Sequence, residues 1–168
     1  MRVMGIDPGL TRTGYGVVEV RGSALAAVES GTVHAARGRS APEQLRDLRA
    51  RLAEAIARTA PEAVAIERLF FNSNARTAIR VGQASGVALL AAAEAGLPVV
   101  EYTPTEVKLA VVGVGNASKD QVGFMVRRIL GAVDPDTPDA ADALALAICH
   151  ANASRMEAVA ARARGSAR

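Results

Sequence analysis

Four acidic residues lie either at the end of an apolar run or at the start of a predicted helix. Asp7 ends a short apolar run, and Glu67 ends the run "EAVAIE". Asp139 and Asp142 follow Pro138 at an i, i+3 spacing, which places both on one side of a helix. A buried ionised carboxylate is costly unless it is paired or binds a cation. Four oxygen donors, without sulfur or imidazole, favour Mg²⁺ or Mn²⁺ over zinc.

Each carboxylate also has a simpler explanation. Asp7 precedes a Pro-Gly pair and could form an Asx turn. Glu67 could pair with Arg68 or Arg76, and acids at a helix start could merely complement the helix dipole. Taken one at a time, these readings stay open. Taken together, they leave unanswered why two strands both end on acids, so we favour the metal site.

Other side chains could act beside such a metal. Phe70 and Phe71 lie in the loop "RLFFNSN", directly after Glu67. We expect Phe71 to join the core and Phe70 to stack on a nucleic-acid base. Lys108 and Lys119 flank the loop 113–118 and could hold phosphates or the attacking water. The alternative for each lysine is a solvated charge on a helix.

The composition narrows the class of protein. The chain has 168 residues, half of them hydrophobic, which suits one domain with a full core. One cysteine, Cys149, and two histidines, His34 and His150, exclude an internal disulfide framework and a Cys/His zinc site. We see no signal peptide and no apolar stretch long enough to span a bilayer, and we expect a cytoplasmic protein with no membrane partner. A net charge of +3 favours an anionic partner.

Periodicity and turn residues predict the elements that position these side chains. Three strands come first and later strands alternate with helices, so the order predicts a five-stranded mixed sheet with helices on both faces. If the first and fourth strands are neighbours, Asp7 and Glu67 emerge at the same edge of the sheet, where the last helix could dock its N-terminus. The expected strands cover 2–7, 14–20, 24–33, 62–67 and 98–102. The expected helices cover 43–59, 75–95, 104–111, 119–130 and 138–153.

Four segments, in this order, closely resemble the RuvC family of bacterial Holliday-junction resolvases, the crossover junction endodeoxyribonucleases. They are "GIDPGLTRTGYGVV", "AIERLFFNSNARTAIRVGQASGVA", "EYTPTEVKLAVVGVGNASKDQV" and "PDAADALALA". The resemblance implies a ribonuclease H-like α/β fold, with a nuclease domain over 1–153. The basic residues 154–168 lie beyond it, and we expect a disordered tail there.

The resemblance also implies an activity and the residues that carry it. The family consists of homodimeric, metal-dependent endonucleases that nick two opposed strands of a four-way DNA junction and leave ligatable 5′-phosphate ends in recombination and repair. Its members work with the RuvA and RuvB branch-migration proteins. Mg²⁺, with two ions per site, would be the cofactor, and Mn²⁺ would substitute for it. The matching positions are Asp7, Glu67, Asp139 and Asp142 as catalytic metal ligands, Phe70 as an aromatic that inserts at the junction centre, and Lys108 and Lys119 as basic residues at the active site. We also expect Arg76 and Arg80 to contact DNA.

Three rival functions remain to be distinguished. A sugar-kinase or actin-like ATPase also has a phosphate loop after a strand ending in "GID", but it needs two lobes, and this chain supplies one. A non-catalytic junction-binding module would keep the acids as relics. Another nuclease of the ribonuclease H-like fold would cut linear duplex or an RNA–DNA hybrid.

The long helix 75–95 carries a candidate dimer contact. Gly82, Gly86 and Ala93 lie near one stripe of it, with Leu89 and Leu90 close by. Small residues allow two helices to approach, and the leucines add apolar area. The alternative is that this stripe packs on the chain's own sheet, since every helix of such a fold buries one face.

Overall fold

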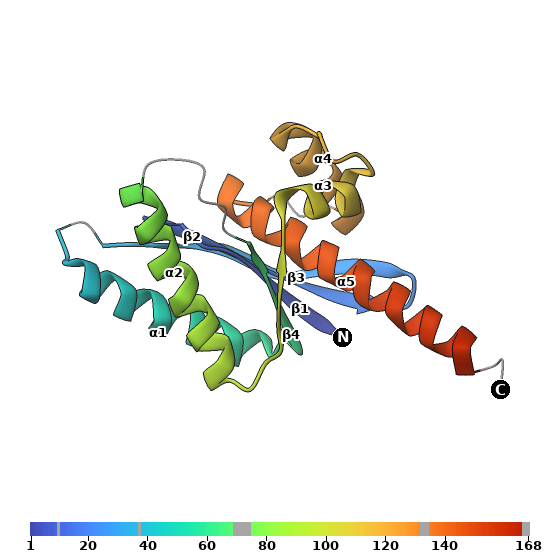
Figure 1. Ribbon diagram of the computed structural model, residues 1–168, viewed down its shortest axis with the longest axis horizontal. Coiled ribbons are helices and arrows are strands. Elements are labelled where there is room, and N and C mark those ends of the chain that lie inside the picture. Colours follow the sequence, from blue (N-terminus) through green and yellow to red (C-terminus); the bar gives the residue numbers. More distant parts are fainter. Residues whose placement is uncertain (10, 37, 69–74, 132–134, 166–168) are drawn as a thin grey trace.

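The computed structural model describes residues 1–9, 11–36, 38–68, 75–131 and 135–165 (Figure 1). All ten predicted helices and strands are present, and most boundaries lie within two residues of the predicted ones. The strands are β1 (Arg2–Asp7), β2 (Arg12–Arg21), β3 (Ala24–His34), β4 (Ala63–Glu67) and β5 (Val99–Tyr102). The helices are α1 (Ala41–Thr59), α2 (Ala75–Glu94), α3 (Pro104–Val112), α4 (Lys119–Leu130) and α5 (Pro138–Gly165).

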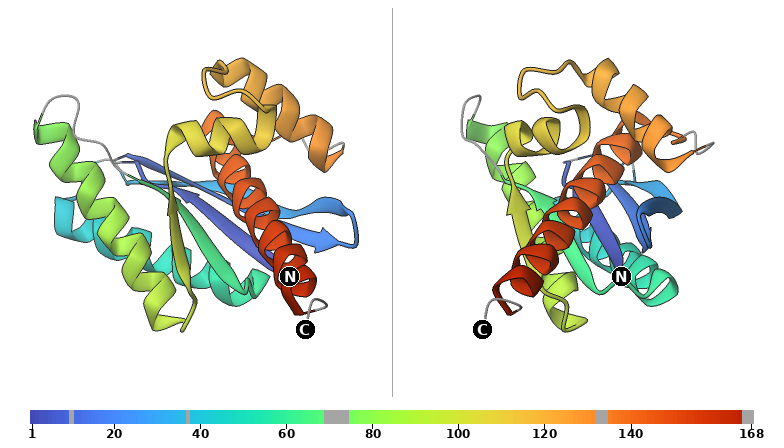
Figure 2. Two further views of the ribbon diagram at one scale, coloured as in Figure 1. Left: turned by 45° about the vertical axis from the view of Figure 1, so that its right-hand side comes forward. Right: turned by 90° about the vertical axis from the view of Figure 1, so that its right-hand side faces the viewer.

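The five strands form one mixed sheet in the order β3-β2-β1-β4-β5. β1, β2 and β3 pair antiparallel through tight connections, whereas β4 and β5 join in parallel through the crossover helices. Helices α1 and α2 lie on one face of the sheet, and α3, α4 and α5 lie on the other (Figures 1 and 2). The predicted fold class is therefore confirmed.

The alternation of side chains along β1 and β4 decides which face receives the acids. Met4 and Ile6 of β1 pack in the core beneath α1 and α2, whereas Val3 packs in the core beneath α5. Asp7 has the parity of Val3, and it therefore belongs to the face that α5 covers. The same alternation puts Glu67 on that face, because Ala65 packs in the α5 core.

Capping residues set the starts of the helices on that face. Thr103 and Ser118 each form a capping box, with Glu106 and Gln121 as the third helical residues. Thr137 Oγ1 accepts a hydrogen bond of 3.1 Å from the backbone N–H of Ala140 and so caps α5. Helix α5 consequently begins next to the acids that it carries.

The predicted end of the last helix at 153 is wrong, because α5 continues to Gly165. The added residues are almost all alanine, arginine, methionine and glutamate, which are good helix formers, and no breaker occurs before the glycine. Extending a helix that already exists also avoids the cost of nucleation. Residues 156–164 are exposed, so the helix propensity of these residues, and not packing against the rest of the protein, maintains the C-terminal end of α5. The division into a domain and a tail at 153 stays a prediction.

The first half of α5 is buried on all sides. Residues from Ala143 to Cys149 are at most 4% exposed. Burial raises the pKa of the Cys149 thiol to about 12, and its Sγ lies 3.8 Å from the Glu106 carbonyl oxygen. None of the described helices is both long and apolar enough to cross a membrane.

Two glycines let α5 approach the sheet at backbone distance. A Cβ atom added at Gly5 of β1 would collide with the carbonyl oxygen of Ala143. One added at Gly14 of β2 would collide with the carbonyl oxygen of Asp139. These glycines are therefore required for the close approach of the α5 N-terminus to β1 and β2, rather than for an unusual backbone conformation.

Gly14→Ala should lower stability and disturb the start of α5. The added methyl group meets backbone that cannot rotate away, so we expect a loss of about 1–3 kcal/mol, typical of overpacking. Urea unfolding measures it. Gly123→Ala in α4 is the control, because the nearest atom to its added Cβ is 3.8 Å away, and alanine there should be neutral or stabilising by up to about 1 kcal/mol. Equal stability of Gly14→Ala and the parent would contradict the close-packing argument.

Candidate active site

Asp7 and Glu67 meet at one edge of the sheet because their strands are parallel neighbours. Ile6 of β1 is in register with Ile66 of β4, so the next residue of each strand lies at the same level. Both strands point their carboxyl ends to this edge, which is where ligands commonly bind in open α/β sheets. The sequence prediction that these two acids emerge together is thereby supported by the pairing.

Three of the four predicted acids line a single hollow. Asp7 and Glu67 contribute from the sheet and Asp142 from the first turns of α5, and the two lysines Lys108 and Lys119 complete its polar lining. The rest of the wall is largely apolar and comes from α3, α4 and α5: Pro104, Val107, Val122, Ala145 and Leu146. The hollow thus combines negative oxygens, two ammonium groups and a low-dielectric wall.

Burial, together with the neighbouring carboxylates, raises the pKa values of Asp7 and Glu67. Burial, followed by the charges of Glu67 and Asp142, raises the pKa of Asp7 from 3.8 to about 7, and Lys119 only partly offsets this. Burial and the Asp142 charge also raise the pKa of Glu67. A site of this kind has more negative charge than its surroundings neutralise, which is the condition that a divalent cation relieves.

Two cationic side chains hold the acids of α5. Lys119 Nζ donates a 2.9 Å hydrogen bond to Asp142 Oδ2, and this pair raises the pKa of Lys119. Arg12 Nε lies 3.1 Å from Asp139 Oδ2. That contact is an ion pair, but its geometry is not that of a hydrogen bond. Asp139 Oδ2 is buried and accepts no hydrogen bond. Asp139 consequently has a positively charged neighbour, Arg12, but its Oδ2 accepts no hydrogen bond.

The donor set fits a hard divalent cation. It consists of carboxylates, two of which, Asp7 and Glu67, have raised pKa values, and the buried Oδ2 of Asp139 accepts no hydrogen bond. In the part of the chain that the structure describes, no three Asp, Glu, His or Cys side chains are close enough together to enclose an ion. Asp139 and Asp142 are turned instead toward Arg12 and Lys119. The assignment of all four acids as metal ligands therefore stays a prediction.

The simpler explanation for Glu67 loses one of its partners. Arg68 Nε lies 3.9 Å from Glu101 Oε2 of β5, and the Arg68 side chain forms no ion pair with Glu67. The other proposed partner, Arg76, belongs to α2, but its side chain is outside the described residues. Phe70 and Phe71 also lie outside the described residues, so their predicted roles in stacking and in the core remain predictions.

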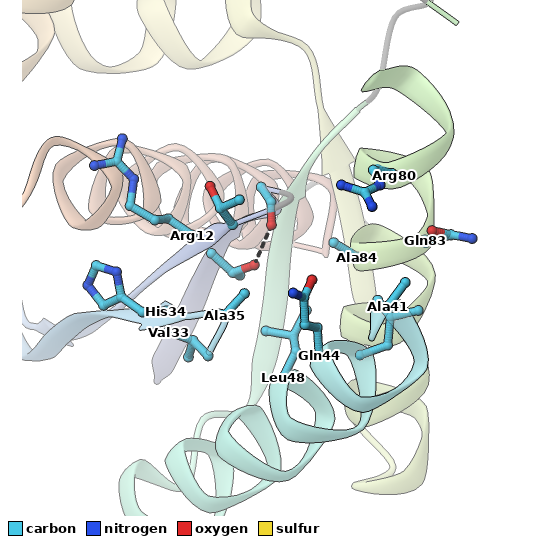
Figure 3. A pocket seen from close by; sticks show the side chains of 14 residues that line it. Arg12, Val33, His34, Ala35, Ala41, Gln44, Leu48, Arg80, Gln83 and Ala84 are labelled. Carbon is cyan, nitrogen blue, oxygen red and sulfur yellow. Dashed lines mark hydrogen bonds between the residues drawn. The ribbon is translucent and has the colours of Figure 1, made fainter. Parts of the chain in front are cut away.

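Arg80 does not line the carboxylate hollow. It lines a second hollow with Arg12, His34 and Gln44, between the ends of β2 and β3 and the helices α1 and α2 (Figure 3). This hollow borders the same end of the sheet. Arg12 was not predicted from the sequence, because its partner Asp139 is far along the chain and the pairing depends on how α5 docks.

The metal-free protein should become less stable as pH rises from about 4 to about 7. In that window the unfolded chain has released the Asp7 proton, whereas the folded chain still binds it, so the free energy of unfolding falls as pH rises. Asp7→Asn removes the part of this dependence that Asp7 contributes and leaves the part due to Glu67, whose pKa is also raised. Urea unfolding in a chelator should show the variant more stable than the parent at pH 8, by about 1–3 kcal/mol, and not at pH 4. A parent that is the more stable of the two at pH 8 would contradict the crowding of charge.

Comparison with known proteins identifies the family. Residues 3–150 match the family model described as "Crossover junction endodeoxyribonuclease RuvC". A protein of that name from Pelotomaculum thermopropionicum is 52% identical over 153 residues, which cover 90% of this chain and 93% of the relative. The structure of Thermus thermophilus RuvC in complex with a Holliday junction substrate superposes with a TM-score of 0.88 at 43% identity, covering 94% of this chain and 96% of that one. The yeast mitochondrial resolvase Ydc2 shares the fold at a TM-score of 0.62 and 15% identity. With four carboxylates at the ends of β1 and β4 and the start of α5, this chain belongs to the RuvC family of crossover junction endodeoxyribonucleases.

Proposed function

We propose that this protein resolves four-way DNA junctions by metal-dependent hydrolysis of one phosphodiester on each of two opposed strands. The single observation that carries this proposal is the gathering of acids from three separate elements around one edge of the sheet, beside two lysines. The RuvC relatives are endonucleases, and the Thermus thermophilus relative is described with a Holliday junction substrate. Nucleases of this family are metal-dependent.

Asp7, Glu67, Asp139 and Asp142 would hold the metal, which we propose to be a pair of Mg²⁺ ions replaceable by Mn²⁺. When bound, such ions activate a water molecule and stabilise the leaving 3′ oxygen in an in-line displacement. Asp7 must be deprotonated to bind a cation, so protons compete with the metal and the affinity for Mg²⁺ should rise with pH. The apolar wall of the hollow limits competing water and strengthens these charge interactions.

The two lysines would handle the negative charge of the substrate. Lys119 is largely exposed at its tip and bonds Asp142 through one donor only, so its remaining N–H groups are available to a phosphate. Lys108 lines the other side of the same hollow. We propose that both contact the scissile phosphate or the attacking water. Products with 5′-phosphate and 3′-hydroxyl ends follow, as expected of the family.

Phe70 and Arg76 complete the proposed DNA surface. Phe70 follows Glu67 by three residues in the sequence, and we propose that it stacks on an unpaired base at the junction centre. Arg76 and Arg80, near the start of α2, would contact the backbone. The RuvA and RuvB branch-migration proteins are proposed partners by the family resemblance, and a bacterial cytoplasm is the proposed location.

Cutting two opposed strands requires two active sites, and we propose a homodimer built on α2. The side chains of Ala84, Ala88 and Ala92 face the core, whereas a different stripe of the helix faces solvent. Ile79, Leu89 and Leu90 on that outer stripe are 60%, 37% and 51% exposed. A Cβ atom at Gly82 or Gly86 would meet nothing within 4 Å. This outer stripe therefore does not pack on the chain's own sheet, which removes the alternative weighed from the sequence.

The direct test of the function compares substrates. The purified protein with Mg²⁺ should cut a synthetic four-way junction at paired, opposed positions, and it should cut linear duplex and RNA–DNA hybrid far less. Ligation of the nicked products without further treatment tests the end chemistry. Equal cutting of linear duplex would favour another nuclease of this fold, and binding without cutting would favour a non-catalytic junction module.

Asp7→Asn should abolish cleavage but not junction binding. The amide has the same size but cannot supply the charge that a divalent cation needs, so we expect a loss of about 100-fold or more in single-turnover cleavage. Affinity comes mainly from contacts between basic residues and phosphates, and it should change little in a gel-shift titration. Asp47→Asn on α1, distant from the hollow, is the control and should cut normally. Near-parental cutting by Asp7→Asn would refute the site.

Gly86→Glu should give a folded monomer that cuts junctions poorly. A bulky charge in the middle of the outer α2 stripe would prevent two helices from approaching, while the open space around Gly86 leaves the fold unaffected. Sedimentation measures the oligomeric state, and circular dichroism checks the fold. Ala50→Glu on the exposed face of α1 adds the same charge and should remain dimeric. A parent that stays monomeric at micromolar concentration yet makes paired nicks would exclude this interface.

A further inference from the structure

Arg12 is placed to serve two partners. It is the first residue of β2, its backbone is fixed by pairing with His34 of β3, and its side chain is 55% exposed. In one direction Nε reaches Asp139 Oδ2 at 3.1 Å. In the other, Arg12 forms part of the second hollow, opposite Arg80 of α2 (Figure 3).

The ion pair between Asp139 and Arg12 has a geometry that makes the interaction weak. Asp139 Oδ2 is buried without a hydrogen bond, so the pair lacks the aligned N–H donor that makes arginine–carboxylate contacts strong. An ion pair with one partner this exposed contributes little stability. Arg12 can therefore leave Asp139 at small cost once the charge on that carboxylate is taken up by another cation.

The rim of the second hollow suits the approach of a backbone phosphate, although its interior has room for only about one water molecule. Arg12 and Arg80 lie on opposite sides of it, with His34 beside Arg12, and Gln44 adds an amide donor (Figure 3). Among the described residues that line it there is no carboxylate. It lies at the same end of the sheet as Asp7 but on the α1 and α2 side, whereas the carboxylate hollow lies on the α5 side, and Arg12 both lines the second hollow and pairs with Asp139.

We propose that Arg12 is a ligand for a non-scissile phosphate of the junction, and that it rests on Asp139 until a divalent cation takes that carboxylate. This inference rests on the proposed function. A cation bound by Asp139 removes the attraction for the guanidinium and adds repulsion, and the nearest anions then available are backbone phosphates. Metal loading and phosphate binding by Arg12 are thereby linked, and each should favour the other.

The first test measures junction binding with and without a divalent ion. Arg12→Ala and the parent are titrated with a synthetic four-way junction over a range of salt, once in EDTA and once with Ca²⁺, which replaces Mg²⁺ to slow cleavage. With Ca²⁺ the variant should bind more weakly, and its salt dependence should fall by about one phosphate contact. In EDTA the two should bind alike.

The second test measures the metal without DNA. The affinity for Mn²⁺, followed by its electron paramagnetic resonance signal, should rise about two- to fivefold in Arg12→Ala, because a competing cation has been removed. Arg21→Ala is the matched control. Arg21 ends the same strand, about 30 Å away at a rise of roughly 3.3 Å per residue, and it also pairs with a glutamate.

Several outcomes would overturn the proposal. Equal weakening by Arg12→Ala in EDTA and in Ca²⁺ would mean that Arg12 contacts DNA regardless of the metal. No weakening in either condition would exclude the phosphate contact. A fall in Mn²⁺ affinity would make Arg12 a support for Asp139 and not its competitor. Failure of the proposed function itself looks different, because the parent would then fail to bind or cut the junction, whereas the Mn²⁺ measurement does not depend on DNA.

Discussion

The active site depends on how closely helix α5 can approach the sheet. Asp7 and Glu67 are fixed by the ends of β1 and β4, but the other two acids arrive on a helix from the far end of the chain. That helix reaches them only because Gly5 and Gly14 present bare backbone to Ala143 and Asp139. A protein interior is packed too densely to absorb even one methyl group at such a contact without a shift. The composition of two strands therefore sets the spacing of carboxylates carried by a helix.

The same approach creates an electrostatic problem that the fold solves only in part. Bringing acids together under an apolar wall raises the pKa values of Asp7 and Glu67, which signals that the folded chain pays for their proximity. Lys119 and Arg12 lower that cost by pairing with Asp142 and Asp139. Both side chains are more than half exposed, and we propose that a metal ion and DNA displace these contacts. The resting site is thus stabilised by groups that substrate binding can recruit.

Much of this arrangement follows from the sequence, because it depends on local signals. The two apolar runs that end on Asp7 and Glu67 predict that both acids emerge at the same edge of the sheet if their strands are neighbours, and the Thr137-Pro138 start predicts where α5 begins. The end of α5 could not be predicted in the same way. The apolar face of the helix stops well before Gly165, and the exposed residues beyond it continue the helix through their helix propensity alone. The Arg12–Asp139 pair joins residues distant in the chain, and no local signal precedes it.

The burial of Cys149 has a practical consequence for measuring conformational changes of this protein with fluorescent labels. It is the chain's single cysteine, and it lies in the dense first half of α5 with a thiol pKa of about 12, so thiol reagents should barely modify it at neutral pH. A cysteine introduced on the exposed end of the same helix would then be the one site that a fluorophore labels. Two such labels, one on each protomer of a dimer, would report by energy transfer how far apart the ends of α5 stand when a junction is bound and when it is released.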